Sequence, residues 1–348
     1  MASPLYRRHS AGLAATYADV ENHALSQPEV IIGTPGSVTI RQNAAGVRFY
    51  ARQYYDHDRR KRDQYIGVDS PETEAKVIAL RARIEEAKDI LVSVRLLARE
   101  GYAVLPPKHL AAIAPLSSHG VFAAGALLVG THAFDVMVNR LGIRVAAAFA
   151  TEDIDIARPH KLALDNPMKG GLREMLRESG IEFVDVPALS HKDPSTKLKE
   201  SGRSRFTFDV LVPARGEEAE IVAVPELGIH ATGLPYLAYL LGETQMGAAL
   251  SSQGVAAVRI PVPERFALHK LVVSRLRKGR SAKSLKDLQQ ASALIAALGE
   301  LYPGALENAY ARTPASRRSD IRKSLEQVRS SLEAHPQSWD EIARAAGL

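Results

Sequence analysis

Hydrophobic positions follow two different periods in the first hundred residues. Between residues 37 and 68 they alternate with a period of two, in short runs separated by a turn at 43–46, which predicts a β-hairpin and a third strand near 64–68. Between residues 71 and 100 they recur every three or four residues, as in an amphipathic helix, and Gly101 ends the pattern. These patterns predict an N-terminal module made of a hairpin and one long helix.

The middle of the chain alternates between strand and helix patterns, and the last part is helical. Strand-like apolar runs lie at 122–129, 154–157, 181–186 and 206–212, and helical patterns lie between them at 131–140 and 172–178. From Pro263 onward the period is helical. We therefore expect three parts: the N-terminal module in 1–105, a central α/β domain in 106–262 and a helical domain in 263–348.

The composition excludes several kinds of protein. The 348 residues include no cysteine, which rules out disulfide scaffolds, cysteine-ligated zinc or iron–sulfur sites and thiol catalysis. No apolar stretch reaches the ~18 residues that span a membrane, and the N-terminus lacks the apolar core of a signal peptide. We expect a cytoplasmic protein without a membrane partner. Its net charge of +6 is compatible with an anionic partner but does not require one.

Three aspartates carry the chemistry that the pattern indicates. Asp153 and Asp155 are separated by one residue in a strand pattern, so both side chains project from one face, where they repel each other unless a cation lies between them. Asp209 lies off the apolar face of a later strand pattern. Oxygen ligands without histidine or cysteine favour a hard ion, and we expect Mg²⁺, with Mn²⁺ as the alternative. Together the three carboxylates predict a two-metal site.

A turn suited to phosphate precedes these aspartates. Gly130 and Thr131 follow an apolar strand pattern and open a helical one, where free backbone N–H groups bind anions. Each feature alone has an ordinary explanation, because an Asp-x-Asp pair or a single strand aspartate is often only solvated charge. Their order along the chain favours phosphoryl transfer. A metal-dependent nuclease and a non-catalytic nucleic-acid-binding protein are the alternatives.

The arrangement resembles the nucleotidyltransferase signature of the DNA polymerase β superfamily. Gly130 and Thr131 match its glycine turn, residues 153–156 its apolar-Asp-apolar-Asp strand, and Asp209 its third acid. Two departures are Thr131, where the superfamily usually has Gly or Ser, and the 23-residue step from Gly130 to Asp153. The longer context, residues 47–300, is similar to the bacterial NTP_transf_8 branch. The segments that carry this similarity are 60–67, 208–213 and 261–271.

The resemblance implies an α+β fold with a polymerase β-like core, in which a mixed sheet is flanked by helices. It also implies transfer of a nucleoside monophosphate from an NTP to a hydroxyl acceptor, with Asp153, Asp155 and Asp209 as catalytic metal ligands. The acceptor would be RNA, such as tRNA, or a protein. Stand-alone relatives act in toxin–antitoxin and defence settings, and such a setting implies a cognate antitoxin as a partner.

A second group of candidates lies in the C-terminal half. Lys270 falls opposite the apolar stripe of its predicted helix, so we expect the core to leave it unburied, and Asp287 lies at the edge of the next helix's stripe. A similar Lys and Asp pairing is found in abortive-infection nucleotidyltransferase toxins. That similarity implies that Lys270 binds the triphosphate and that Asp287 positions Lys270 or acts as a catalytic base. The alternative is an exposed lysine and a surface aspartate.

Basic residues surround these candidates. Residues 265–286 contain eight Lys or Arg and no acid, among them Arg277 and Lys283, which we expect to bind the nucleotide together with Lys270. Two further basic clusters lie at 48–62, interleaved with aromatic residues, and at 197–205. Such clusters suit contacts with RNA or with a triphosphate alone, and a solvated basic face is the ordinary explanation.

Overall fold

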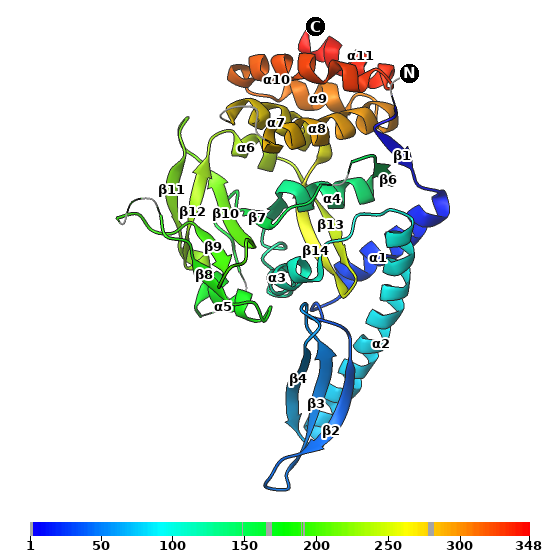
Figure 1. Cartoon of the computed structure of the whole chain (residues 1–348), viewed down its shortest axis with the longest axis vertical. Coiled ribbons are helices and arrows are strands. Elements are labelled where there is room, and N and C mark those ends of the chain that lie inside the picture. The colour runs from blue at the N-terminus through cyan, green and yellow to red at the C-terminus, as the bar shows by residue number, and fades with distance from the viewer. Residues whose placement is uncertain (1–2, 148, 165–168, 189, 191, 278–281) are drawn as a thin grey trace.

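The computed structural model of the chain describes residues 3–147, 149–164, 169–188, 190, 192–277 and 282–348. An arm formed by N-terminal residues extends from one end of the molecule, and a central sheet with its helices forms the body (Figure 1). The C-terminal helices cover the opposite end of the body. None of the described helices is long and apolar enough to cross a lipid bilayer.

The arm is an antiparallel sheet packed on a long helix. Its elements are β2 (Ser37–Gln42), β3 (Arg48–Tyr55), β4 (Lys61–Val68) and α2 (Pro71–Arg99), with the strands paired in the order β2-β3-β4. Ser70 caps α2 by accepting a hydrogen bond from the N–H of Thr73, and Pro71 occupies the first turn. The predicted hairpin, third strand and long helix are confirmed, although β4 begins at Lys61 rather than at residue 64.

Several elements were not indicated by the sequence pattern. They are β1 (Tyr6–Arg8), which pairs with β6 (Ile143–Val145), α1 (Ala11–Ser26), and the hairpin of β13 (Thr244–Ser251) and β14 (Gly254–Pro261). In α1 the buried residues are Tyr17, Val20 and Ala24, a stripe too sparse to read as a helix. Most of β13 and β14 is buried on both faces, which removes the alternation that identifies a strand.

The central sheet is mixed. Seven of the described strands belong to it, in the order β11-β12-β10-β7-β5, with β9 pairing with β10 and β8 with β9. β10 runs parallel to β7 and β12, whereas the other pairs are antiparallel. The strands are β5 (Leu127–Val129), β7 (Asp153–Ala157), β8 (Phe183–Asp185), β9 (Lys197–Glu200), β10 (Thr207–Pro213), β11 (Glu220–Val224) and β12 (Ile229–Leu234).

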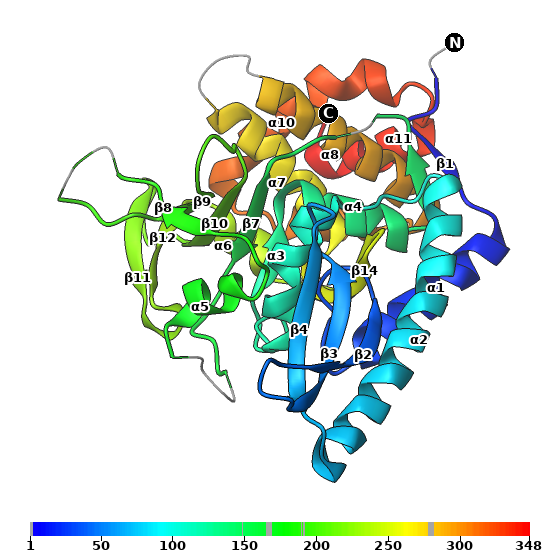
Figure 2. The same ribbon diagram turned by 60° about the horizontal axis from the view of Figure 1, so that its bottom comes forward.

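Helices flank this sheet and continue into the C-terminal region (Figure 2). Around the sheet they are α3 (Pro107–Ser118), α4 (Gly130–Arg140), α5 (Gly171–Arg177) and α6 (Leu237–Leu241). The C-terminal helices are α7 (Pro263–Leu276), α8 (Ala282–Leu301), α9 (Ala305–Ala311), α10 (Ala315–Val328) and α11 (Pro336–Ala346), and short 3₁₀ turns lie at Pro225–Leu227 and Arg329–Leu332. The expected α+β fold, a mixed sheet flanked by helices with a helical C-terminal part, is confirmed.

The sheet and the C-terminal helices share one hydrophobic core. A continuous cluster of buried apolar residues extends from the sheet into the helices from α7 to α11. The division of the chain at 105/106 and 262/263 therefore stays a prediction. The alternation in β7 and β10 decides where the site lies, because Ile154, Ile156, Phe208 and Val210 are all buried in the core. The intervening aspartates must point to the other face of the sheet.

Candidate active site

The three predicted aspartates lie on two neighbouring strands of the sheet. Asp155 of β7 is directly opposite Asp209 of β10 in the parallel pairing, and Asp153 is opposite Thr207. Neighbouring strands are about 4.8 Å apart, so the backbones of Asp155 and Asp209 are this close. All three aspartates are half-buried. The structure thus brings the predicted carboxylates together on one face of the sheet.

Burial and mutual repulsion change how these carboxyl groups titrate. Burial, together with the neighbouring charges of Asp153 and Asp209, raises the pKa of Asp155 to about 6. Burial also raises the pKa of Asp209, against the opposing effect of Lys197, whose Nζ lies 2.8 Å from Asp209 Oδ2. The carboxyl groups of Asp155 and Asp209 therefore keep their protons to higher pH than a free aspartate does.

Asp153 differs from its two neighbours. Burial would raise the pKa of this carboxyl group, but a hydrogen bond from Thr151 and the charges of Lys283 and Lys286 lower it below its ordinary value. Lys283 Nζ lies 3.7 Å from Asp153 Oδ2. Asp153 is consequently the carboxylate of the pair that stays ionised at lower pH.

Gly130 makes room for the Asp155 carboxylate. It is the first residue of α4, directly after β5, and its φ of +69° lies in the left-handed region that favours glycine. A Cβ at this position would lie 2.5 Å from Asp155 Oδ2. No side chain caps this end of α4, so its first N–H groups can bind a phosphate. Thr131, the next residue, is buried and lines the same cavity.

Replacing Gly130 with alanine should reduce nucleotidyl transfer by at least about 100-fold, because the new methyl group displaces the Asp155 carboxylate by several tenths of an ångström. Gly120→Ala is the matched control, since Gly120 has the same φ of +69° and nothing within 4 Å of the added Cβ. Both variants should lose roughly 1–2 kcal/mol of stability from backbone strain. Steady-state transfer rates and thermal unfolding separate the two effects, and equal rates for both variants would contradict this role of Gly130.

The second predicted group forms a buried ion-pair network. Asp287 of α8 is 1% exposed, and its Oδ1 lies 2.6 Å from Lys270 Nζ while its Oδ2 lies 2.7 Å from Arg277 Nε. The expectation that Lys270 is left unburied is wrong, because α8 packs against α7 and reduces the exposure of Lys270 to 8%. The alternative of an exposed lysine with a surface aspartate is therefore excluded.

The remaining cations of the segment 265–286 lie in different surroundings. Lys283 and Lys286 of α8 line the cavity with Lys270 and Arg277, and burial lowers the pKa of Lys286. Arg265 instead pairs with Glu243 at 2.8 Å, away from the carboxylates. Lys278 and Arg280 lie outside the described residues. The predicted basic cluster thus contributes four described cations to the site. Lys286 was not among the predicted nucleotide-binding residues, although its position one helical turn after Lys283 places the two side chains on the same face of a helix.

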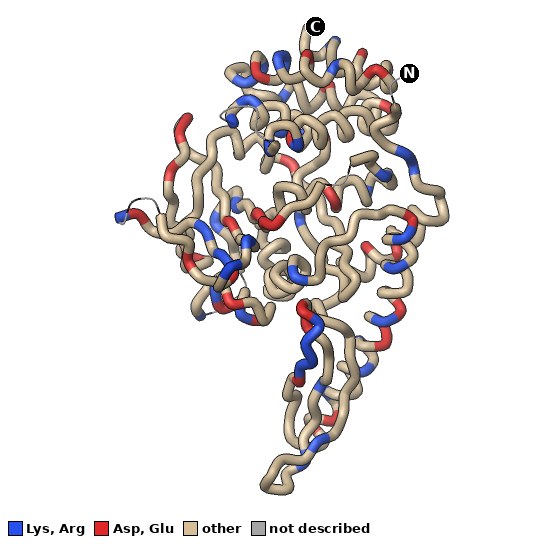
Figure 3. Tube along the Cα trace, viewed as in Figure 1, with Lys and Arg blue, Asp and Glu red and all other residues tan. Residues whose placement is uncertain are grey.

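The Asp153 and Asp155 carboxylates and the ion-pair network of Lys270, Arg277 and Asp287 line one cavity of about 650 Å³. Gly130, Asp153 and Asp155 line one side and the cations of α7 and α8 line the other, whereas Asp209, next to Asp155 on β10, is not part of the lining. In the trace of Figure 3, acidic and basic segments both lie between the central sheet and the C-terminal helices. Lys197 and Arg205, from the basic cluster at 197–205, also line the cavity. No spacing along the chain connects this cluster to Asp209. The volume and the charge of this cleft suit a nucleoside triphosphate.

The carboxylates also fit a hard divalent cation. No group of three or more His, Asp or Glu side chains among the described residues forms a ready-made metal cage. Mg²⁺ does not need one, because it usually takes one or two carboxylates and completes its shell with substrate phosphates and water. Asp153 and Asp155 supply such a pair, on one face of β7 and in the lining of the cleft. Asp209 is available as a third ligand once it leaves Lys197.

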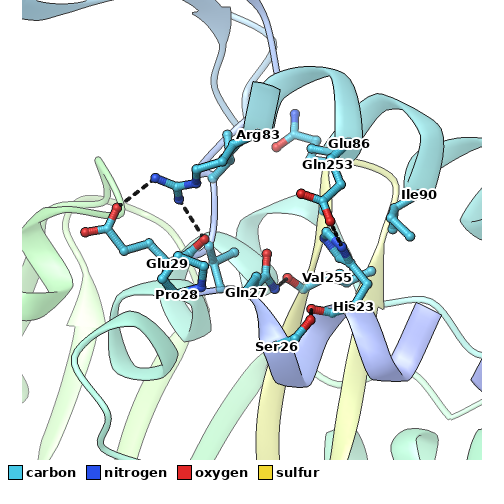
Figure 4. A pocket seen from close by; sticks show the side chains of 14 residues that line it. His23, Ser26, Gln27, Pro28, Glu29, Arg83, Glu86, Ile90, Gln253 and Val255 are labelled. Atoms are coloured by element: carbon cyan, nitrogen blue, oxygen red, sulfur yellow. Dashed lines mark hydrogen bonds and ion pairs between the residues drawn. The ribbon is translucent and has the colours of Figure 1, made fainter. Parts of the chain in front are cut away.

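A second cavity lies at the base of the arm, between α1, α2 and the turn joining β13 to β14 (Figure 4). Its charged groups bind each other: Arg83 lies 3.3 Å from Glu29 and His23 lies 3.1 Å from Glu86. Its volume is about 110 Å³. Because it is smaller and its charges are paired, it is a poorer match for a triphosphate than the cleft.

The paired strand aspartates, the third aspartate on the adjacent strand and the glycine turn opening a helix form the arrangement expected of a nucleotidyltransferase. A model of the NTP_transf_8 family, described as a nucleotidyltransferase, matches residues 108–315, and the chain belongs to this family. It is a transferase of nucleotidyl groups. The match begins after the arm, so the segment 60–67 lies outside it. No curated protein and no solved structure matches the chain.

Proposed function

We propose that the enzyme transfers a nucleoside monophosphate from an NTP to a hydroxyl acceptor in a Mg²⁺-dependent reaction, with Mn²⁺ as an alternative ion. The observation that carries this proposal is the register of Asp155 opposite Asp209, with Gly130 in direct contact distance of Asp155. A cleft lined by carboxylates on one side and by cations on the other suits a substrate that binds through its phosphates.

The residues of the cleft have distinct tasks in this proposal. The N–H groups at Gly130 and Thr131, together with Lys270 and Arg277, bind the phosphates and hold the α-phosphorus in line with the acceptor oxygen. The acceptor oxygen forms a bond to the α-phosphorus, the bond to the bridging oxygen breaks, and pyrophosphate leaves. Asp153 and Asp155, together with Asp209, would hold a divalent ion, which would neutralise phosphate charge and lower the pKa of the acceptor hydroxyl, whose proton passes to solvent.

Asp287 acts as a positioning residue in this proposal. Both of its carboxylate oxygens are engaged by cations, and the side chain is almost completely buried. A carboxylate bound in this way fixes the two cationic side chains in one orientation. This arrangement favours the positioning role over the role of a base.

The acceptor is proposed to be a hydroxyl of RNA, such as tRNA, or of a protein. A toxin or defence setting with a cognate antitoxin is a further prediction that rests on the resemblance, and a cytoplasmic location is a prediction from the sequence pattern. Incubation of the protein with each α-³²P-labelled NTP, Mg²⁺ and either total RNA or lysate identifies the acceptor by the polymer that becomes labelled. Fragmentation of unlabelled RNA without label transfer would favour a nuclease, and binding without either reaction would favour a non-catalytic protein.

A further inference from the structure

The outer face of the arm's sheet is exposed and carries aromatic rings. The other face packs on α2: Tyr50 is buried there, and a Cβ on Gly67, its partner in β4, would lie 2.6 Å from Thr73 of α2. Side chains alternate along a strand, so Phe49, the neighbour of Tyr50, points to the outer face. Tyr55 belongs to that outer face as well.

The register of the sheet places three rings on this outer face. Tyr65 is opposite Ala51 and its ring lies 5.7 Å from that of Phe49, while Tyr55 is opposite Lys61. Tyr55 is 51% exposed and Tyr65 is 62% exposed, which is unusual for tyrosines in a sheet. Large exposed rings on a sheet are suited to stacking with nucleotide bases.

The arm is also strongly basic. Residues 37–68 contain seven Arg or Lys and three Asp, a net charge of +4 within a chain whose net charge is +6. All three aspartates have basic partners: Asp56 is buried against Arg62 at 2.8 Å, Asp63 pairs with Arg41 at 2.9 Å and Asp58 lies 3.7 Å from Arg60. Within the part of the chain that the structure describes, Lys61 has no carboxylate partner. A polyanion complements this charge.

Not every residue of the basic and aromatic segment 48–62 is free to bind a partner. Arg52 is buried and donates to the backbone carbonyls of Ile32, Thr34 and Pro35. Its guanidinium also lies 4.3 Å from the centre of the Tyr54 ring. These contacts stabilise the arm, and they distinguish its structural residues from those on the outer face.

A surface connects the arm to the cleft. Lys108 of α3 lies 2.8 Å from Glu200 of β9 and 3.9 Å from Asp58 at the base of the arm. The other end of β9 is Lys197, which lines the cleft, and β9 covers only about 10 Å. In both ribbon views α3 lies between β9 and the arm (Figures 1 and 2).

We propose that the outer face of the arm binds an unpaired segment of the acceptor RNA, through stacking on Tyr55 and Tyr65 and a phosphate contact to Lys61, while the end of that RNA reaches the cleft. The proposal rests on the proposed function only for the identity of this RNA as the acceptor. A duplex hides the faces of its bases, so the rings favour an unpaired strand. RNA is the polynucleotide that is ordinarily single-stranded.

The test measures binding of a fluorescein-labelled, single-stranded RNA 20-mer to the full chain by fluorescence anisotropy, without NTP. The double variant Tyr55→Ala/Tyr65→Ala should bind roughly 10-fold or more weakly, and the corresponding double Phe variant should bind as the wild type does. Tyr302→Ala is the matched control, because Tyr302 is 52% exposed between α8 and α9 and should leave binding unchanged. Lys61→Ala should remove one phosphate contact and thereby reduce the slope of log Kd against log salt concentration by about 0.7, the value for a single strand.

Several outcomes would overturn the proposal: no binding by the wild type, unchanged binding by the double Ala variant, or equal affinity for duplex RNA. Circular dichroism and thermal unfolding show whether each variant is folded. Asp155→Asn, which should block transfer, should bind the RNA normally. Variant-sensitive RNA binding without any transfer would therefore refute the proposed function alone, whereas transfer to RNA that is unaffected in the double Ala variant would refute the role of the arm alone.

Discussion

Replacing Asp155 with asparagine should abolish nucleotidyl transfer and, in the metal-free protein, stabilise the fold at pH 8. Transfer should fall by about 10³-fold or more, because the variant loses one of the carboxylates that would hold the divalent ion in the proposed reaction. The stability effect has a different cause. Since the pKa of Asp155 in the folded protein is raised to about 6, its ionised form is less favourable in the folded state than in the unfolded state.

The pH window follows from the direction of this shift. The protonated Asp155 carboxyl group stabilises the folded protein; this contribution is fully present below pH ~4 and is lost as the pH rises through about 6. Asparagine does not ionise, so the variant should exceed the wild type by roughly 1–3 kcal/mol in free energy of unfolding at pH 8 and by much less at pH 4.5. Urea unfolding in the presence of EDTA at the two pH values measures this difference.

A control substitution tests whether these effects belong to the site. Asp185→Asn makes the same change on β8, where the carboxylate pairs with Arg173 at the surface at 2.7 Å. This variant should retain transfer and should not gain stability at pH 8. An Asp155→Asn variant with normal transfer, or with the same stability gain at both pH values, would contradict the assignment.

Replacing Asp287 with alanine should lower the free energy of unfolding by roughly 3–5 kcal/mol and abolish transfer. The substitution leaves Lys270 buried without a counter-charge and removes one anchor of Arg277. Asp320→Ala in α10 is the control, because its contact with Arg317 at 3.7 Å is near the surface and should be worth less than about 1 kcal/mol. Chemical denaturation and transfer rates are measured on the same preparations.

A double variant separates stability from activity at this position. In Lys270→Met/Asp287→Leu both buried charges are replaced by apolar groups, which should recover most of the stability lost in Asp287→Ala. Transfer should stay lost, because no cation remains at position 270 to bind the triphosphate. Recovery of transfer together with stability would show that the pair has only a structural role.

The sequence was most informative where local periodicity decides the geometry. Alternation alone places Asp153 and Asp155 on one face of a strand, and the apolar positions of 206–212 place Asp209 off the core. The parallel pairing that sets Asp155 opposite Asp209 is not written in the periodicity, since register depends on the whole sheet. The resemblance to a known family assigned Asp209 to the same site but gave no register.

Tertiary contacts account for what the sequence did not predict. A helical wheel counts only the stripe of its own helix, so it left Lys270 on an open side, whereas α8 covers that side and supplies Asp287. Lys197 reaches Asp209 through the antiparallel pairing of β9 with β10, which no spacing in the sequence indicates. The Lys197–Asp209 pair was therefore visible only in the folded chain, whereas the resemblance already implied the pairing of Lys270 with Asp287.

The most direct test of the central claim compares two positions of the label in the same NTP. With α-³²P-NTP, Mg²⁺ and the acceptor, the account predicts that the label enters the acceptor and that one pyrophosphate is released for each nucleotide transferred. With γ-³²P-NTP the label should appear in pyrophosphate and not in the acceptor, and Asp155→Asn should show neither result. Entry of the γ-label into the acceptor, or transfer by Asp155→Asn at the rate of the wild type, would contradict the account.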